Sequence, residues 1–299
     1  MRAVWLREFG PPSVLVPGSA PEPHGDVVID VAYANITFVE TQVRAGRGPF
    51  PVTLPAIPGN GVGGYAGGRR VIASLGGAGG GYAERVAVDA AVPIEVPDGV
   101  ALDDAVALLA DGRTALMLTD AVAVAPGERV LVLAAAGGVG TLLLQLVPAA
   151  VGAVGSAAKL DVVRSFGAEA ALYDDAVGPG RAYDVVFDGV GGPLARAAFA
   201  RIVPGGRMLS YGLASGEWAG ISAEAAAARG VTLVEPERDP AKVRGYAVRA
   251  LSAGLRPLIG QRFPLDRAAD AHAAIEARAT VGKTLLTVAQ NPHEDSADL

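Results

Sequence analysis

The chain has 299 residues, of which 51% are hydrophobic and 19% charged, with 25 Lys and Arg against 31 Asp and Glu for a formal net charge of −6. This length suits about two domains, and an acidic balance without a Lys/Arg cluster argues against a nucleic-acid-binding protein. The absence of cysteine excludes disulfides and thiol catalysis. We see no apolar stretch of membrane-spanning length and no signal region after Met1, so we expect a cytoplasmic protein without a membrane partner.

The first chemically informative segment along the chain is VLVLAAAGGVG at residues 130–140. Its continuous apolar run is typical of a parallel strand covered on both faces, and the apolar spacing of residues 141–146 favours a packed helix. Glycines in such a turn let the backbone approach a dinucleotide diphosphate, whose charge meets the N–H groups of the helix start. We expect the diphosphate at Gly137, Gly138, Val139 and Gly140. The strict G-x-G-x-x-G pattern would need glycine at Ala135, and such turns also occur without a ligand.

The end of a second strand, within residues 153–159, should choose between NAD and NADP. An acidic residue there binds the ribose hydroxyls of NAD, whereas a cation or a hydroxyl accommodates the 2′-phosphate of NADP. This segment has no acid, but Ser156 can donate a hydrogen bond and Lys159 can supply a positive charge. We therefore expect NADPH. The alternative is that Ser156 caps a helix and that Lys159 is a solvated charge on it.

Two further apolar runs end in glycines, at residues 183–192 and 206–212. Strands that alternate with helical stretches predict an α/β fold with a doubly wound parallel sheet, whose strand ends line one crevice.

Several segments carry a family resemblance: MRAV at 1–4 with EFG at 8–10, GGYAERV at 80–86, the glycine turn at 134–140, LRPLIG at 255–260, and AHAAIE at 271–276 with TVGK at 280–283. Together they resemble the zinc-independent quinone oxidoreductase (zeta-crystallin-like) branch of the medium-chain dehydrogenase/reductase superfamily, from residue 1 to about residue 288. The resemblance implies a Rossmann-type NADP-binding domain at 111–250 and a β-rich, GroES-like catalytic domain at 1–110 and 251–290, with the substrate between them. Residues 291–299 are polar and acidic, and we expect a flexible tail.

The resemblance also implies residues around the nicotinamide. Thr37 stands where the family has asparagine and Glu40 where it has aspartate, and we predict that these two are catalytic. Phe38 and Thr41 are expected to contact the cofactor. No strong general acid is evident, so we expect the proton to come from water. From its residue type alone, Thr37 is equally suited to cap a turn or a helix.

Six further cofactor contacts follow from the resemblance. Thr114 is expected near the nicotinamide, Tyr173 near the adenosine phosphate, Val190, Gly212 and Leu213 beside the ribose and nicotinamide, and Arg278 at a phosphate. A plain packing role is the alternative for Tyr173, because tyrosine commonly buries its ring.

Zinc is not expected. Related alcohol dehydrogenases bind catalytic zinc with cysteine and histidine, but this chain has no cysteine and only His24, His272 and His293. Asn60 and Gly61 stand where those relatives have a zinc-binding histidine and the glutamate beside it. We therefore predict no metal site.

Without zinc, hydride addition to a quinone or an activated double bond remains feasible, because the nicotinamide carries the chemistry. The protein must hold the ring, exclude water and donate a hydrogen bond to the oxygen that gains charge. We predict an NADPH-dependent reductase of small quinones or α,β-unsaturated carbonyl compounds. The alternatives are a noncatalytic NADPH-binding sensor or scaffold and an NAD(P)-linked alcohol dehydrogenase, which the missing metal ligands disfavour.

Two segments depart from the family pattern in length. Residues 61–70 are shorter, as if a hairpin had been trimmed, and residues 145–159 are shorter with Pro148 interrupting the helix. A strand at residues 207–212 is expected near a sheet edge, which relatives commonly pair across a twofold axis. We therefore expect a homodimer.

Overall fold

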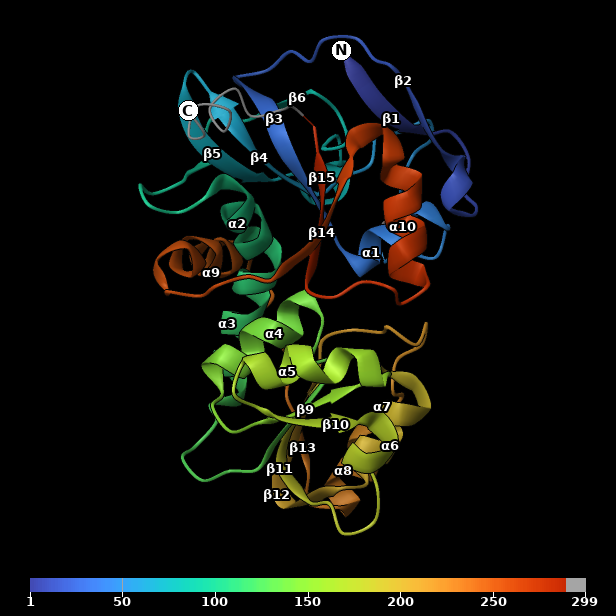
Figure 1. Ribbon diagram of the computed structural model, residues 1–299, viewed down its shortest axis with the longest axis vertical. Coiled ribbons are helices and arrows are strands. Elements are labelled where there is room, and N and C mark those ends of the chain that lie inside the picture. Colours follow the sequence, from blue (N-terminus) through green and yellow to red (C-terminus); the bar gives the residue numbers. More distant parts are fainter. Residues whose placement is uncertain (50, 289–299) are drawn as a thin grey trace. The chain divides into compact units, whose positions relative to one another are not determined.

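The computed structural model describes residues 1–49 and 51–288, so the tail expected at 291–299, residues 289–290 of the expected catalytic domain, and His293 lie outside the described residues. The chain forms two compact units: Asp111–Leu258, here called the Rossmann-type unit, and Met1–Ala110 with the chain from Ile259 onward, here called the β-rich unit (Figure 1). The chain passes from the β-rich unit into the Rossmann-type unit within a π-helical segment, Leu108–Gly112.

The chain returns from the Rossmann-type unit to the β-rich unit after residue 258, eight residues later than expected. Helix α9 (Pro240–Ser252) packs against α3 (Arg113–Val122) of the Rossmann-type unit. Beyond α9, the Gln145 side chain bonds both backbone groups of Arg256, donating to its carbonyl at 2.9 Å and accepting from its N–H at 3.0 Å. These contacts hold residues 251–258 in the Rossmann-type unit, whereas the sequence led us to expect them in the catalytic domain.

The Rossmann-type unit contains the doubly wound parallel sheet that the apolar runs predict. Its order is β10-β9-β8-β11-β12-β13, and every pairing is parallel. The strands are β8 (Val130–Leu133), β9 (Val151–Val154), β10 (Glu169–Leu172), β11 (Tyr183–Asp188), β12 (Ile202–Ser210) and β13 (Thr232–Leu233). The chain runs outward from β8 to β10 and then outward again from β11 to β13. Its direction therefore reverses between β8 and β11, where this fold places its ligand.

The remaining helices of this unit are α4 (Gly138–Leu146), α5 (Leu160–Ser165), α6 (Tyr173–Ala176), α7 (Gly192–Phe199) and α8 (Ala223–Ala228). Helix α4 ends two residues before Pro148, because a proline inside a helix lacks the backbone N–H donor and its ring clashes with the preceding turn. The shortened connection still produces a second strand of four residues, β9, paired with β8 on one side and β10 on the other.

The β-rich unit is built on a sheet of order β14-β15-β3-β4-β5-β7, with β6 also paired to β3, and on the separate pair β1-β2. Its strands are β1 (Arg2–Leu6), β2 (Leu15–Ser19), β3 (Val27–Ile36), β4 (Gly61–Ala66), β5 (Arg69–Ser74), β6 (Arg85–Val88), β7 (Ile94–Glu95), β14 (Ile259–Pro264) and β15 (Lys283–Thr287), and its α-helices are α1 (Phe38–Arg44), α2 (Leu102–Ala107) and α10 (Ala268–Glu276). The late strand β15 lies beside the early strand β3 (Figure 1), so the end of the chain completes this sheet.

The trimmed hairpin is the β4-β5 connection. Only Gly67 and Gly68 join the two strands, with φ of 54° and 79°. Two successive residues in the left-handed region match the right-handed twist of a tight hairpin, and glycine adopts this conformation without strain.

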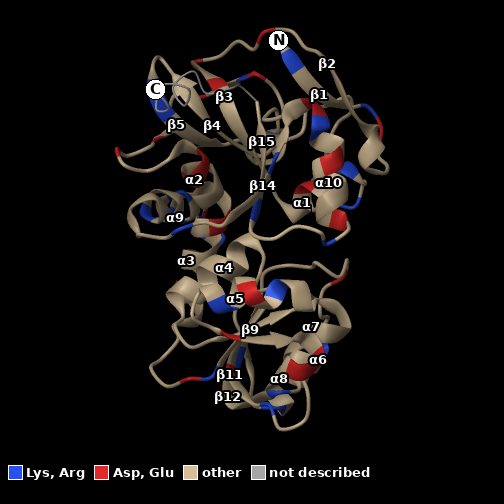
Figure 2. Cartoon of the chain, in the orientation of Figure 1, with Lys and Arg blue, Asp and Glu red and all other residues tan. Residues whose placement is uncertain are grey.

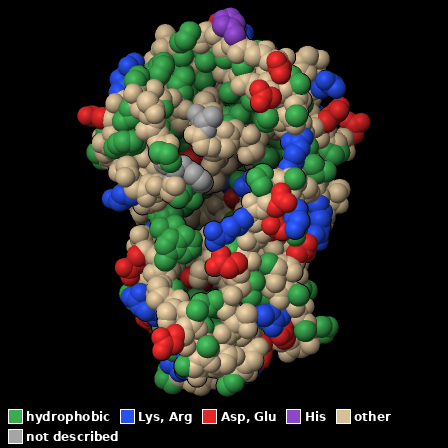
Figure 3. All heavy atoms as spheres, turned by 180° about the vertical axis from the view of Figure 1, so that it is seen from behind, with side chains coloured by type: hydrophobic (Ala, Val, Ile, Leu, Met, Phe, Trp, Pro, Cys, Tyr) green, Lys and Arg blue, Asp and Glu red, His purple; other side chains and the backbone are tan. Residues whose placement is uncertain are grey.

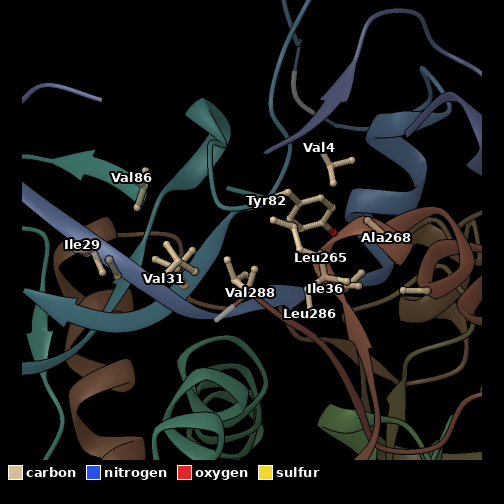
Figure 4. Close-up of a cluster of buried hydrophobic side chains, with 14 of the residues drawn as sticks. Val4, Ile29, Val31, Ile36, Tyr82, Val86, Leu265, Ala268, Leu286 and Val288 are labelled. Atoms are coloured by element: carbon tan, nitrogen blue, oxygen red, sulfur yellow. The ribbon is translucent and has the colours of Figure 1, made fainter. Parts of the chain in front are cut away.

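The core of the β-rich unit lies between the sheet, β1 and α10. Figure 4 shows the Tyr82 ring among the side chains of Val4, Leu265 and Ala268, and all four residues are buried. Leu286 of β15 belongs to the same cluster, so the returning chain supplies part of the core as well as a strand.

Charged residues of both signs are distributed through both units (Figure 2), and on the face shown in Figure 3 charged side chains are interspersed with apolar ones. Among the described residues, no helix is long and apolar enough to cross a membrane.

Candidate active site

The glycine turn after β8 brings the backbone close to itself at the start of α4. The turn begins at Ala134, whose φ is 56°, and the Gly137 N–H donates to the Ala134 carbonyl at 2.9 Å. A Cβ on Gly140 would lie 2.4 Å from that same carbonyl oxygen, so only glycine lets α4 approach the strand this closely. Gly140 is buried, whereas Gly137, Gly138 and Val139 are half-buried and reach the surface. The turn therefore offers the start of α4 as an anion cradle.

The start of α3 adjoins this turn. The carboxylate of Asp111 lies 1.9 Å from the position of a Cβ on Gly138, so the two residues are in contact. Thr114, expected near the nicotinamide, lies in the first turn of α3, three residues beyond Asp111. The sequence did not identify Asp111 as a site residue, because its proximity to the glycine turn depends on tertiary packing.

At the end of β9, Ser156 is the N-cap residue of a short 3₁₀ turn, Ala157–Lys159. Its side chain is exposed and makes no capping hydrogen bond, while its carbonyl accepts from the Lys159 N–H at 3.1 Å. The Tyr173 ring lies 3.1 Å from the position of a Cβ on Gly155. The structure thus brings Tyr173 to the end of β9, against Gly155, the residue that precedes Ser156.

The loops after β11 and β12 lie side by side. The Ser215 N–H donates to the Val190 carbonyl at 2.8 Å, and the Tyr211 N–H donates to the Asp188 carbonyl at 2.9 Å. Val190, Gly212 and Leu213, expected as neighbours of the ribose and nicotinamide, therefore come from two adjoining loops at one edge of the sheet.

In the β-rich unit, Thr37 occupies the N-cap position of α1 and Glu40 lies in its first turn. The Glu40 carboxylate accepts from the Thr37 N–H at 2.6 Å, from the Thr37 hydroxyl at 3.3 Å and from the Asn60 N–H at 2.9 Å. Thr37 is thus a helix cap, as its residue type suggested, and its hydroxyl also contacts the other predicted catalytic residue.

Burial of the Glu40 side chain raises the pKa of its carboxyl to about 7, and the hydrogen bonds from Thr37 and Asn60, with the charge of buried Lys283, oppose a larger rise. A group with this pKa can hold or release a proton near neutral pH. The sequence identified Asn60 only as the position of an absent zinc ligand and Lys283 only as part of the TVGK segment, so neither was expected to influence Glu40.

Arg278 and Phe38 form one contact of the β-rich unit. The Arg278 guanidinium lies over the Phe38 ring, 4.7 Å from its centroid, and Arg278 has a φ of 58°. Thr41, for which a cofactor contact was expected, is fully buried, and its hydroxyl donates to the Phe38 carbonyl at 2.7 Å in the first turn of α1.

Helices α1 and α10 are joined by buried polar contacts. Arg44 of α1, 2% exposed, forms an ion pair with Glu276 of α10. The Tyr82 hydroxyl and His272 Nε2 are 2.8 Å apart, and burial lowers the pKa of His272 to about 3, so this histidine is neutral.

The position of the family's zinc-binding histidine holds a different contact. Asn60 Oδ1 accepts from Asn35 Nδ2 at 3.1 Å, and a Cβ on Gly61 would lie 3.1 Å from the Leu109 side chain. Among the described residues, no group of three or more His, Cys, Asp or Glu side chains is placed to hold a metal ion. His24 is exposed and His272 is paired with Tyr82.

Comparison with known proteins identifies the family. A family model described as zinc-binding dehydrogenase matches residues 161–286. The chain is 33% identical over 335 aligned positions to a probable quinone oxidoreductase of Schizosaccharomyces pombe, covering 99% of this chain and 98% of that protein. The chain belongs to the quinone oxidoreductase branch of the medium-chain dehydrogenase/reductase superfamily. It is an oxidoreductase of this type.

Solved structures agree with this assignment. The quinone oxidoreductase of Thermus thermophilus, determined also in complex with NADPH, has a TM-score of 0.84 at 28% identity, covering 96% of this chain and 100% of that one. A mycobacterial protein complexed with NADPH has a TM-score of 0.85 at 29% identity, with the same coverage. Both confirm the expected α/β fold of this family member.

Proposed function

We propose that this quinone oxidoreductase family member binds NADPH and reduces quinones or α,β-unsaturated carbonyl compounds without zinc. The observation that carries the proposal is the glycine turn between β8 and α4, where a Cβ on Gly138 or Gly140 would meet neighbouring atoms and where the start of α4 reaches the surface, which supports a diphosphate site. Two structural neighbours are NADPH complexes, which supports the same cofactor here.

For each part of NADPH we propose residues that would bind it. Gly137, Gly138 and Val139 would hold the diphosphate, and the exposed Ser156 hydroxyl with Lys159 would bind the 2′-phosphate, with Tyr173 beside them. Thr114, Val190, Gly212 and Leu213 would contact the nicotinamide half, and Arg278 is proposed to bind a phosphate. When bound, NADPH supplies the hydride.

Reduction also requires a proton, because hydride addition leaves negative charge on the acceptor oxygen. We propose that Thr37 donates a hydrogen bond to this oxygen and that Glu40 supplies the proton through the Thr37 hydroxyl. In the structure the Thr37 hydroxyl donates to Glu40. When Glu40, whose pKa is about 7, is protonated, this bond would reverse, so that Glu40 donates its proton to Thr37 Oγ1 and the Thr37 hydrogen passes to the substrate. The acceptor gains one hydride and one proton, and Glu40 is reprotonated from solvent. This replaces water as the immediate proton source expected from the sequence.

Zinc independence rests on the donor groups present. The Asn60 amide is a weak zinc ligand and is bonded to Asn35, and cysteine, the usual partner ligand, is absent from the sequence. A quinone or an enone is already electrophilic, so its reduction does not require the polarisation that alcohol oxidation needs.

A substrate screen tests the proposed function. NADPH and NADH oxidation would be followed with quinones, enones and aldehydes, together with NAD(P) reduction by alcohols. We expect oxidation of NADPH in preference to NADH, with quinones or enones as acceptors. Activity confined to alcohols and aldehydes would favour the alcohol dehydrogenase, and tight NADPH binding without any acceptor would favour a sensor or scaffold.

We also propose a homodimer formed through the β12 side of the parallel sheet. The sheet ends at β13, a two-residue strand that pairs with Arg207 and Met208 of the nine-residue β12. Because β13 pairs with two of the nine residues of β12, we propose that a second copy pairs along the rest of this edge.

A further inference from the structure

Asp188 ends β11 and is fully buried. Its Oδ1 accepts from the Val190 N–H at 2.9 Å and from the Gly191 N–H at 2.8 Å, and its Oδ2 accepts from the Ser210 hydroxyl at 2.9 Å. One carboxylate therefore binds the loop that follows β11 with one oxygen and the end of β12 with the other.

These bonds determine how the two loops meet. Further backbone bonds run from the Ala214 N–H to the Gly189 carbonyl at 3.3 Å and from the Ser215 N–H to the Val190 carbonyl at 2.8 Å. A Cβ on Gly212 would lie 2.7 Å from the Gly189 carbonyl oxygen, so the loops are in direct contact. Asp188 lies beneath this contact and joins the loops from the buried side.

Packing alone does not account for an acid at this position. Burial raises the pKa of Asp188, and the opposing contributions are its three hydrogen bonds, from Gly191, Val190 and Ser210. An apolar side chain would fill the end of a buried strand without the desolvation cost of a carboxyl group. The carboxylate is therefore explained better by the geometry it imposes on the loops than by stability.

We infer that Asp188, through Ser210 and the Val190 and Gly191 N–H groups, is a positioning residue for the nicotinamide half of NADPH. The inference rests on the proposed function, since Val190, Gly212 and Leu213 belong to the same two loops. Asp188 is buried and does not itself touch the cofactor. It fixes the loops in the arrangement that binds the nicotinamide and its ribose, independently of the 2′-phosphate site at the end of β9.

Paired titrations of the full chain test this inference. NADPH is compared with adenosine 2′,5′-bisphosphate, which carries the adenosine half and the 2′-phosphate but no nicotinamide. Ser210→Ala removes one hydrogen bond to Asp188, and Asp188→Asn removes the charge while keeping the shape. Asp184→Asn is the matched control, because Asp184 lies on the same strand but pairs with Arg129 at the surface, away from both loops.

We expect Ser210→Ala and Asp188→Asn to weaken NADPH binding about tenfold, the equivalent of one buried hydrogen bond of about 1.4 kcal/mol. Affinity for the bisphosphate should stay within about twofold of the parent, since its binding residues are untouched. Asp184→Asn should change neither affinity.

The remaining outcomes distinguish a failure of the positioning role of Asp188 from a failure of the proposed function. Unchanged NADPH affinity in Ser210→Ala and Asp188→Asn, or an equal loss for both ligands, would overturn the positioning role. A parent protein that binds the bisphosphate but not NADPH, or neither ligand, would instead contradict the proposed function on which the inference rests. If Asp188→Asn does not fold, Ser210→Ala decides, because it leaves the buried carboxylate and two of its three bonds in place.

Discussion

Glu40 combines burial, a pKa near 7 and a hydrogen bond to the Thr37 hydroxyl. If it supplies the proton, Glu40→Gln should lower kcat about a hundredfold, within the usual range for loss of a general acid. In the parent, kcat should fall as the pH rises through about 7, because Glu40 then loses its proton, and the variant should lack this fall.

The control for this prediction is Thr37. Thr37→Ser keeps the hydroxyl and should retain most activity, whereas Thr37→Ala should resemble Glu40→Gln. A full rate in Glu40→Gln with an unchanged pH profile would exclude this relay.

His272 and Glu40 should affect stability in opposite directions as the pH changes. His272 has a folded pKa of about 3 against an ordinary 6.5, so its contribution is full above 6.5 and is lost as the pH falls towards 3. Glu40 has a folded pKa of about 7 against 4.5, so its contribution is full below 4.5 and is lost as the pH rises through 7. From about pH 7.5 to about pH 5, linkage gives each a change of about 2 kcal/mol with opposite sign.

Denaturant unfolding of variants separates the two contributions. Relative to the parent, Glu40→Gln should lose about 2 kcal/mol of unfolding free energy when the pH is lowered over this range, and His272→Gln should gain a similar amount. Parallel pH curves for the parent and both variants would show that these groups are not buried as described.

At the scale of the elements, Gly138 and Gly140 in the turn between β8 and α4 are required for different reasons. A Cβ on Gly140 meets the backbone carbonyl of Ala134, whereas a Cβ on Gly138 meets the side chain of Asp111. Gly140→Ala should therefore lower the melting temperature. Gly138→Ala should keep the fold and weaken NADPH binding by displacing Asp111 and filling the cradle. Calorimetry measures the melting temperature of each variant, and a fluorescence titration measures its affinity for NADPH. Undiminished NADPH affinity in folded Gly138→Ala would argue against this turn as the diphosphate site.

The elements also show what sequence can predict. The β8 turn and the parallel sheet are predictable because apolar runs and glycine spacing are local patterns. Helix α9 and residues 251–258 belong to the Rossmann-type unit because α9 packs against α3 and Arg256 bonds to Gln145. A local sequence pattern cannot predict these long-range contacts. The same limit applies to the site. Thr37 and Glu40 were expected from the family resemblance, but the raised pKa of Glu40 and the bonds of Asp188 depend on tertiary burial and partners distant in sequence.

At the scale of the whole molecule, the proposed homodimer forms through the sheet edge. If β12 and β13 pair with a second copy, light scattering at micromolar concentration should give a dimer mass. Leu233→Pro removes the backbone donor of β13 that faces away from β12 and should weaken the dimer, while the bond from the Val234 N–H to the Met208 carbonyl inside the sheet remains. A monomer in the parent protein would contradict this arrangement.

The central claim is hydride transfer from NADPH to a quinone or an enone without zinc. The direct measurement treats the purified protein with a chelator, determines its zinc content, loads it with NADPH and mixes it with each acceptor class. We predict one NADPH oxidised for each acceptor reduced, at the same rate before and after chelation. Activity that disappears with zinc and returns when zinc is added, or bound NADPH that no quinone or enone oxidises, would contradict the account.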